Sequence, residues 1–163
     1  MRPDHKGFLL GTEWFLRSYD ANGHVRWEEE VPGTVWGLNL ARNGKLVIAA
    51  CSDGTVRWYR WSDGKQLLAL LVHNDGKRWI AWTPNGYYVS SVGAEDLIGW
   101  HVNRGWQQPA DFFPIAYFRK YLNRPDIITL VLDTLDEDEA IKRANLAAKR
   151  PKLTKSIFSL LPR

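Results

Sequence analysis

The sequence predicts a mainly β protein with a short α-helical appendage at its C-terminal end. Residues 35–74 are four short apolar runs separated by three turn dipeptides, Asn43-Gly44, Asp53-Gly54 and Asp63-Gly64. Asn-Gly and Asp-Gly pairs between apolar runs are strong hairpin signals, because both turn residues tolerate positive φ. The connections are too short to hold a crossover helix, so the four strands should pair antiparallel in chain order.

A repeat extends this unit in both directions. Turns and tryptophans recur about 42 residues apart, a period typical of WD-type propeller blades: Asn43-Gly44 with Asn85-Gly86, Trp58 with Trp100, Trp36 with Trp79, and Asn22-Gly23 with Asp63-Gly64. We therefore expect strands at 7–11, 14–19 and 24–31, four strands within 35–74, and strands at 78–82, 87–92 and 96–102. The predicted fold is a partial WD-type β-propeller of about two and a half blades, because a closed propeller needs at least four.

Helix signals replace the strand pattern after residue 105. Pro114 can open a helical turn over residues 115–122, and Pro125 can open a second helix, since a first helical turn does not need the missing N–H. Asp136 with Glu139 forms a capping pair for a third helix over 137–150. The domains expected are 1–105, the partial propeller blades, and 106–163, the helical C-terminal appendage.

Composition narrows the functional classes. The net charge is +4 and Cys51 is the only cysteine, so no internal disulfide can form. The apolar runs are far shorter than the roughly 20 residues that span a bilayer, and the N-terminal residues lack the apolar core of a signal peptide. We expect a cytoplasmic protein with no membrane segment.

No catalytic or metal-binding pattern is present. The four histidines are scattered, Cys51 lies in an apolar run, and the acidic residues of 133–139 lack the spacing of a calcium loop. We expect no enzyme activity, no metal site and no cofactor. Seven cations follow residue 141, at Lys142, Arg143, Lys149, Arg150, Lys152, Lys155 and Arg163. A helix C-terminus favours cations, and only Phe158 could stack on a base, so we do not expect nucleic-acid binding.

The segment 112–128, FFPIAYFRKYLNRPDII, concentrates large apolar side chains. Exposing them costs about 25 cal/mol per Å², so we expect the segment to dock on the last blade. An arginine of the segment should pair with a carboxylate or a carbonyl. The candidate residues for docking or partner contact are Phe112, Phe113, Phe118, Arg119, Tyr121 and Arg124.

Three stretches, WTPNGYY (82–88), GAEDLIGWHVNRG (93–105) and FFPIAYFRKYLNRPDII, resemble the end of the WD-repeat region in large bacterial multidomain proteins. The later part of those proteins is often a caspase-like peptidase domain, and IFSLLPR (157–163) is similar to the segment before their next domain. Nothing in this chain corresponds to a catalytic His–Cys pair. The resemblance therefore implies a scaffold or sensing section without peptidase activity.

These observations predict a non-catalytic WD-repeat scaffold that mediates protein–protein interaction within a larger or multi-chain assembly. The expected partner is a second protein, or a second copy of this chain, that completes the open propeller ends. The alternative is a regulatory or sensing subunit of a caspase-like peptidase or effector system that acts with a separate catalytic chain. A third interpretation, a nucleic-acid-associated subunit, depends only on the basic residues of the tail.

Overall fold

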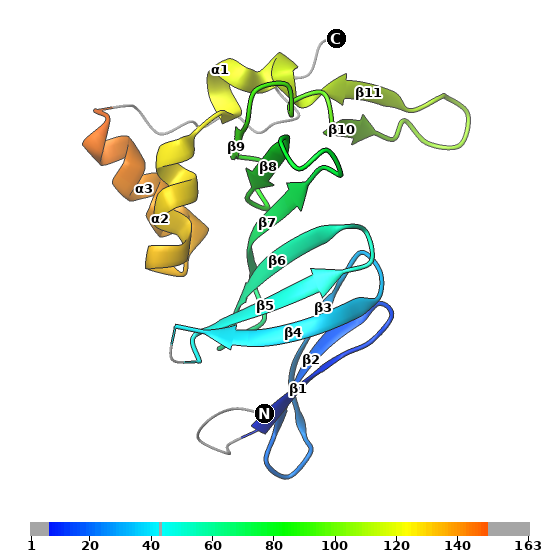
Figure 1. Ribbon diagram of the computed structural model, residues 1–163, viewed down its shortest axis with the longest axis vertical. Helices are drawn as coiled ribbons and strands as arrows, with labels where there is room; N and C mark the ends of the chain where they lie inside the picture. The colour runs from blue at the N-terminus through cyan, green and yellow to red at the C-terminus, as the bar shows by residue number, and fades with distance from the viewer. Residues whose placement is uncertain (1–6, 43, 150–163) are drawn as a thin grey trace.

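The computed structural model describes residues 7–42 and 44–149 of the chain. It is mainly β, with antiparallel sheets followed by helices, as the sequence predicts (Figure 1). The strands are β1 (Gly7–Gly11), β2 (Phe15–Asp20), β3 (Val25–Glu30), β4 (Val35–Ala41), β5 (Leu46–Cys51), β6 (Thr55–Arg60), β7 (Gln66–Val72), β8 (Trp79–Trp82), β9 (Tyr88–Ser90), β10 (Gly99–Val102) and β11 (Asp111–Pro114). The helical elements are the 3-10 helix η1 (Ile115–Phe118), α1 (Arg119–Leu122), α2 (Pro125–Thr134) and α3 (Glu137–Ala147).

The first three strands form a separate antiparallel sheet in the order β1-β2-β3. This sheet packs on β5 and β6 through one apolar cluster, in which Leu16 and Trp27 meet Val47 and Tyr59. The indole Nε1 of Trp27 also donates to the carbonyl of Trp61 at 2.7 Å. The N-terminal unit is therefore attached to the central sheet by burial and by a buried hydrogen bond.

The central sheet has six strands in the order β4-β5-β6-β7-β8-β9. Its turns follow the predicted dipeptides at Asp53-Gly54 and Asp63-Gly64, whereas Asn43 of the first turn lies outside the described residues. Gly64 has a φ of 78°, and a Cβ there would lie 2.6 Å from the Trp27 ring. Glycine is required at this turn both by its conformation and by the close approach of the indole.

The sheet runs on through the expected boundary between the second and third blades, because β7 pairs with β8. A tight turn joins these strands, with the amide of His73 donating to the carbonyl of Arg78 at 2.8 Å. One carboxylate oxygen of Asp75 accepts from the amides of Lys77 and Arg78, each at 2.9 Å. The side chain of Asp75 thus stabilises a hairpin where the repeat pattern suggested the start of a new unit.

The last strand of the third predicted blade also differs from the prediction. This strand begins at Gly99 rather than residue 96, because a turn occupies the preceding residues, with the amide of Leu97 donating to the carbonyl of Ala94 at 3.0 Å. Strand β10 pairs with β11, a strand that was not predicted from the sequence. This hairpin includes residues from both sides of the predicted domain boundary at residue 105.

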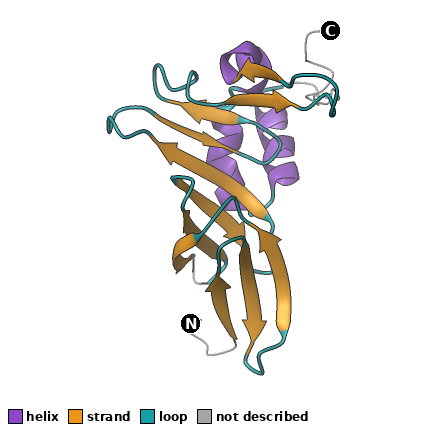
Figure 2. Ribbon diagram, turned by 90° about the vertical axis from the view of Figure 1, so that its right-hand side faces the viewer, coloured by secondary structure: helices purple, strands orange, loops and turns teal. Residues whose placement is uncertain are grey.

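The C-terminal helices cover one end of the central sheet, with α2 beside α3, β7 and β9 and with η1 next to β10 (Figures 1 and 2). Asn123, directly after α1, forms a bridge with Tyr88 of β9. Pro125 is the first residue of α2, and the side chain of Asp136 caps α3 by accepting from the amide of Glu139 at 3.0 Å. Both helix starts agree with the sequence. Among the described residues, no helix is long and apolar enough to cross a membrane.

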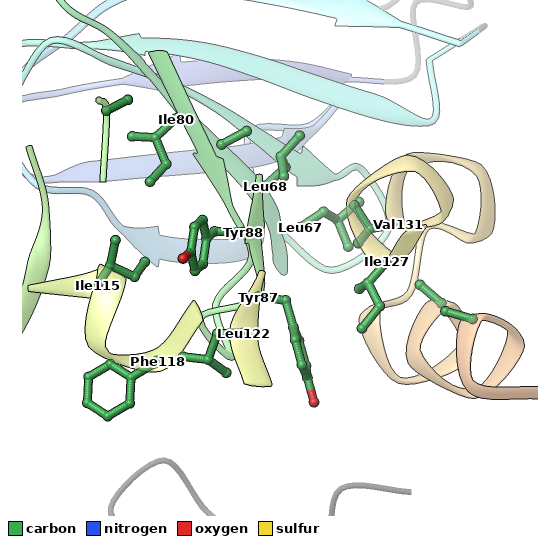
Figure 3. Packing of buried hydrophobic residues seen from close by; sticks show 14 of the residues in the cluster. Leu67, Leu68, Ile80, Tyr87, Tyr88, Ile115, Phe118, Leu122, Ile127 and Val131 are labelled. Carbon is green, nitrogen blue, oxygen red and sulfur yellow. The ribbon is translucent and has the colours of Figure 1, made fainter. Parts of the chain in front are cut away.

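Within the described residues, the hydrophobic core consists of two clusters. The smaller one joins the two sheets, as described above. In the larger one, Ile80 and Tyr88 of the sheet meet Phe118 and Leu122 on one side, while Leu67 faces α2 on the other (Figure 3). The C-terminal helical elements are therefore part of the main core.

Candidate functional site

The elements β11, η1 and α1 carry most of the residues proposed for docking or partner contact. Ile115, Phe118 and Leu122 point into the main core and are at most 3% exposed. The chain then returns to the sheet edge, where the amide of Arg124 donates to the carbonyl of Tyr88 at 2.9 Å. Buried side chains and a backbone hydrogen bond thus fix the position of this segment relative to β9.

A polar cluster stands beside these apolar contacts. The carboxylate of Glu95 is largely buried and accepts from the Tyr88 hydroxyl at 2.6 Å and from Arg119 Nε at 2.8 Å. The side-chain amide of Asn123 donates from Nδ2 to the same carboxylate at 3.5 Å. Hydrogen bonding from Arg119 holds the pKa of Glu95 below its ordinary value, so the carboxylate is charged at neutral pH. Burial, with the neighbouring carboxylate, raises the pKa of Tyr88 and keeps its hydroxyl a donor.

Arg124 has a different role from that of Arg119. Its side chain is buried and donates from Nε to Asp126 at 2.8 Å and from Nη2 to the side-chain oxygen of Asn145 at 3.0 Å. These bonds connect the start of α2 to α3. Arg124 therefore holds the helices together and is not available to a partner.

The other candidate residues divide between the core and the surface. Phe118 is buried, whereas Phe113 is half-buried with its ring 6.5 Å from that of Phe118. Phe112 and Tyr121 are 58% and 39% exposed, and Arg119 also reaches the surface. The structure does not bring Phe112 and Phe113 together, because neighbouring residues of a strand point to opposite faces. The ring of Phe112 lies instead over Gly99.

Two exposed aromatic side chains in this region were missed by the sequence analysis. Tyr117 is 66% exposed and lies with its ring 6.3 Å from that of Phe113, and Trp106 of the β10–β11 loop is fully exposed. Tyr117 and Tyr121 are four residues apart, a spacing that places two side chains on the same side of a helix. That spacing was the signal available for Tyr117. Residues 106–121, which carry Trp106, Phe112, Tyr117 and Tyr121, are called the aromatic segment below.

Residues considered for chemistry lie apart from the aromatic segment. Cys51 is buried in the cluster between the two sheets, and burial together with the charge of Asp53 raises the pKa of its thiol. In residues 7–42 and 44–149, no group of three His, Cys, Asp or Glu side chains could hold a metal ion. Among the cations near the C-terminus, Arg143 pairs with Glu139 at 2.7 Å. Arg150, Lys152, Lys155 and Arg163 lie outside the described residues, as does the stretch 157–163.

No protein-family model matches the chain, and no curated protein matches it. Among solved structures, the chain is similar to BamB from Moraxella catarrhalis, with 16% identity and a TM-score of 0.41 over 55% of this chain and 32% of that chain. It is also similar to the β-propeller domain of Cps50 (Swd1) from Myceliophteria thermophila, with 12% identity and a TM-score of 0.40 over 70% and 36% of the two chains. A computationally designed protein, Ika8, gives 12% identity and a TM-score of 0.35 over 52% and 30%.

The chain therefore spans about a third of the length of each of these proteins. The similarities are distant and concern the arrangement of antiparallel strands, which resembles part of a β-propeller. They say nothing about what this chain binds.

Proposed function

We propose that this chain is a non-catalytic protein-interaction module and that its aromatic segment contacts the partner. The observation that carries the proposal is the exposure of Trp106, Phe112, Tyr117 and Tyr121 within 16 residues of chain. Tyrosine, tryptophan and phenylalanine are enriched at the buried centres of protein interfaces, because they combine a large apolar area with few rotatable bonds.

The anchoring of the segment supports the same function. Phe118 and Leu122 are buried on the inner side of η1 and α1, while Tyr117 and Tyr121 are exposed on these same elements. A partner would meet side chains on a backbone that the core already holds in place. Preorganisation of this kind lowers the entropy lost on binding.

The resemblance to the WD-repeat region of bacterial multidomain proteins adds context to the proposal. In that context the chain would act as a scaffold section, with any catalytic function residing in another polypeptide. The proposal itself depends on the aromatic segment and needs no catalytic residue in this chain.

Site-specific photo-cross-linking in the cells that produce this chain tests the proposal. One variant carries a photoreactive residue at Tyr117, and a matched control carries it at Leu146, which is 79% exposed on α3. We expect one discrete protein adduct from position 117, identified by mass spectrometry, and none from position 146. The same diffuse products from both positions, or no adduct at either, would contradict the proposal.

A further inference from the structure

The edges of the sheets differ in how they are protected. An open strand edge presents unpaired backbone donors and acceptors, and charged side chains or a covering segment normally block it. Strand β3 carries Arg26 and three glutamates, and β9 is covered at Tyr88 by the returning chain at Asn123. Strand β4 is covered only in part, where Gly11 at the end of β1 approaches Val35 and Leu38, while its sequence VWGLNLA contains no charge and β5 is its only partner in the described sheets.

The free part of this edge begins after Val35. The amide of Val35 donates to the carbonyl of Thr12 at 3.0 Å, so the start of β4 is covered by the loop between β1 and β2. Further along, the amide of Leu40 donates to the side chain of Asn39 at 2.8 Å, in an exposed position. A neighbouring side chain thus satisfies a donor that a strand partner would otherwise satisfy. Trp36 is 78% exposed beside this edge.

We propose that β4 is a self-association edge, at which β4 of a second copy of this chain pairs antiparallel through a two-fold axis at Leu38. Open backbone groups select an extended strand as the occupant. The strand that fits must tolerate Trp36 and add no repulsive charge, and β4 itself meets both conditions. The surface is separate from the aromatic segment, so this inference goes beyond the proposed function.

Pairing about Leu38 places apolar residues of β4 opposite apolar residues and brings no charges together. The two-fold register places Trp36 opposite Leu40 of the second copy and Gly37 opposite Asn39. Aromatic–aliphatic cross-strand pairs stabilise a sheet, and like charges directly opposite destabilise it. The nearest charged residue along the chain, Arg42, is already engaged with Asp133 at 3.1 Å and with the carbonyl of Leu132. An isologous contact of this kind closes as a dimer.

Charged substitutions at Asn39 test whether β4 is the dimer interface and whether the two copies are related by a two-fold axis. Asn39 is exposed, and the register places the two copies of residue 39 diagonally across the axis. Sedimentation of the full chain from 1 to 100 µM should show a monomer–dimer equilibrium, while Asn39→Lys and Asn39→Asp should each raise the dimer dissociation constant at least tenfold. An equimolar mixture of these two variants should restore the dimer, because the opposite charges then meet.

The controls separate loss of pairing from loss of folding. Trp36→Lys should also weaken the dimer while the circular dichroism spectrum and melting transition of the monomer remain. Val92→Lys, at a position 99% exposed elsewhere in the chain, should dimerise like the unmodified chain. A monomer at every concentration would overturn the inference. An unchanged dimer dissociation constant in the Asn39 variants would also overturn it. So would a mixture of the two Asn39 variants that fails to restore the dimer.

Discussion

Two tyrosines are buried to the same extent but differ in the hydrogen bonding of their hydroxyl groups. Tyr59 and Tyr88 are both fully buried. The Tyr88 hydroxyl donates to Glu95 at 2.6 Å, whereas the Tyr59 hydroxyl has no hydrogen-bond partner among the described residues. A buried hydroxyl without a partner loses its hydration and gains nothing in return. The two side chains therefore contribute differently to stability although their environments are equally dry.

We predict that Tyr88→Phe lowers the free energy of unfolding by about 1–3 kcal/mol, because a hydrogen bond to a charged group is lost. Tyr59→Phe should leave the stability unchanged or raise it by up to about 1 kcal/mol. Urea denaturation of both variants measures the difference. An equal loss of stability in the two variants would show that the Glu95 cluster makes no specific contribution.

A second carboxylate is buried at the start of α3. Glu137 is 2% exposed and accepts from the amide of Asn85 at 3.2 Å. Burial raises its pKa above the ordinary value of 4.5, more than the hydrogen bonds from Thr83 and Asn85 lower it. Because the folded-state pKa lies above the unfolded value, the charged form costs stability at neutral pH. That cost disappears as the pH falls through the folded-state pKa.

We predict that Glu137→Gln stabilises the protein at pH 7, because the neutral amide can still accept from Asn85. The gain over the unmodified chain should shrink as the pH is lowered through the raised pKa of Glu137 toward the unfolded-state value of 4.5. Thermal melts of both proteins across this pH range follow the difference. A gain that grows on acidification would mean that Glu137 is stabilised as a carboxylate in the folded state.

At the scale of elements, an arginine of the sheet holds the turn between α2 and α3. Arg60 of β6 donates to the carbonyl of Leu135 at 2.8 Å and to Asp136 at 3.1 Å. Leu135 is the C-cap of α2 and adopts a left-handed conformation. A cation at this place satisfies a terminal carbonyl and opposes the negative end of the helix dipole. The contact links residues that are 75 positions apart.

We predict that Arg60→Ala lowers the free energy of unfolding by about 1–2 kcal/mol and increases hydrogen exchange in α2 and α3. Arg143→Ala is the matched control, because its pair with Glu139 lies on the exposed side of α3. That change should cost less than about 0.5 kcal/mol. Equal effects of the two substitutions would contradict a specific role of Arg60.

Local signals explain which elements could be predicted from the sequence. The turns at Asp53-Gly54 and Asp63-Gly64 and the starts of α2 and α3 depend on neighbouring residues, and all were predicted. The β7–β8 hairpin has a similar signal in Asp75-Gly76, but the repeat period suggested a blade boundary there. Strand β11 has only four residues and ends in Pro114. Its pairing with β10 depends on tertiary contacts that the local pattern does not contain.

At the scale of the whole molecule, the location of the candidate region could be predicted from the sequence more readily than the role of each of its residues. The concentration of apolar side chains in 112–128 predicts that this segment packs against another part of the protein. Which members are buried depends on the path of the chain around β9, so Phe118 and Arg124 were not distinguishable from Phe112 and Tyr121. Glu95 could not be identified from the sequence as the ion-pair partner of Arg119, because it lies 24 positions away and many other carboxylates were equally possible partners.

The molecule thus combines a sheet-and-helix core with an aromatic segment held on its surface. The most direct test of this account is a calorimetric titration of the purified chain with the protein cross-linked through position 117. The double substitution Tyr117→Ala and Tyr121→Ala should weaken binding at least tenfold, which is about 1.4 kcal/mol. Leu146→Ala should bind within twofold of the unmodified chain. Unchanged affinity in the double variant, with its fold intact, would contradict the claim that the aromatic segment is the binding surface.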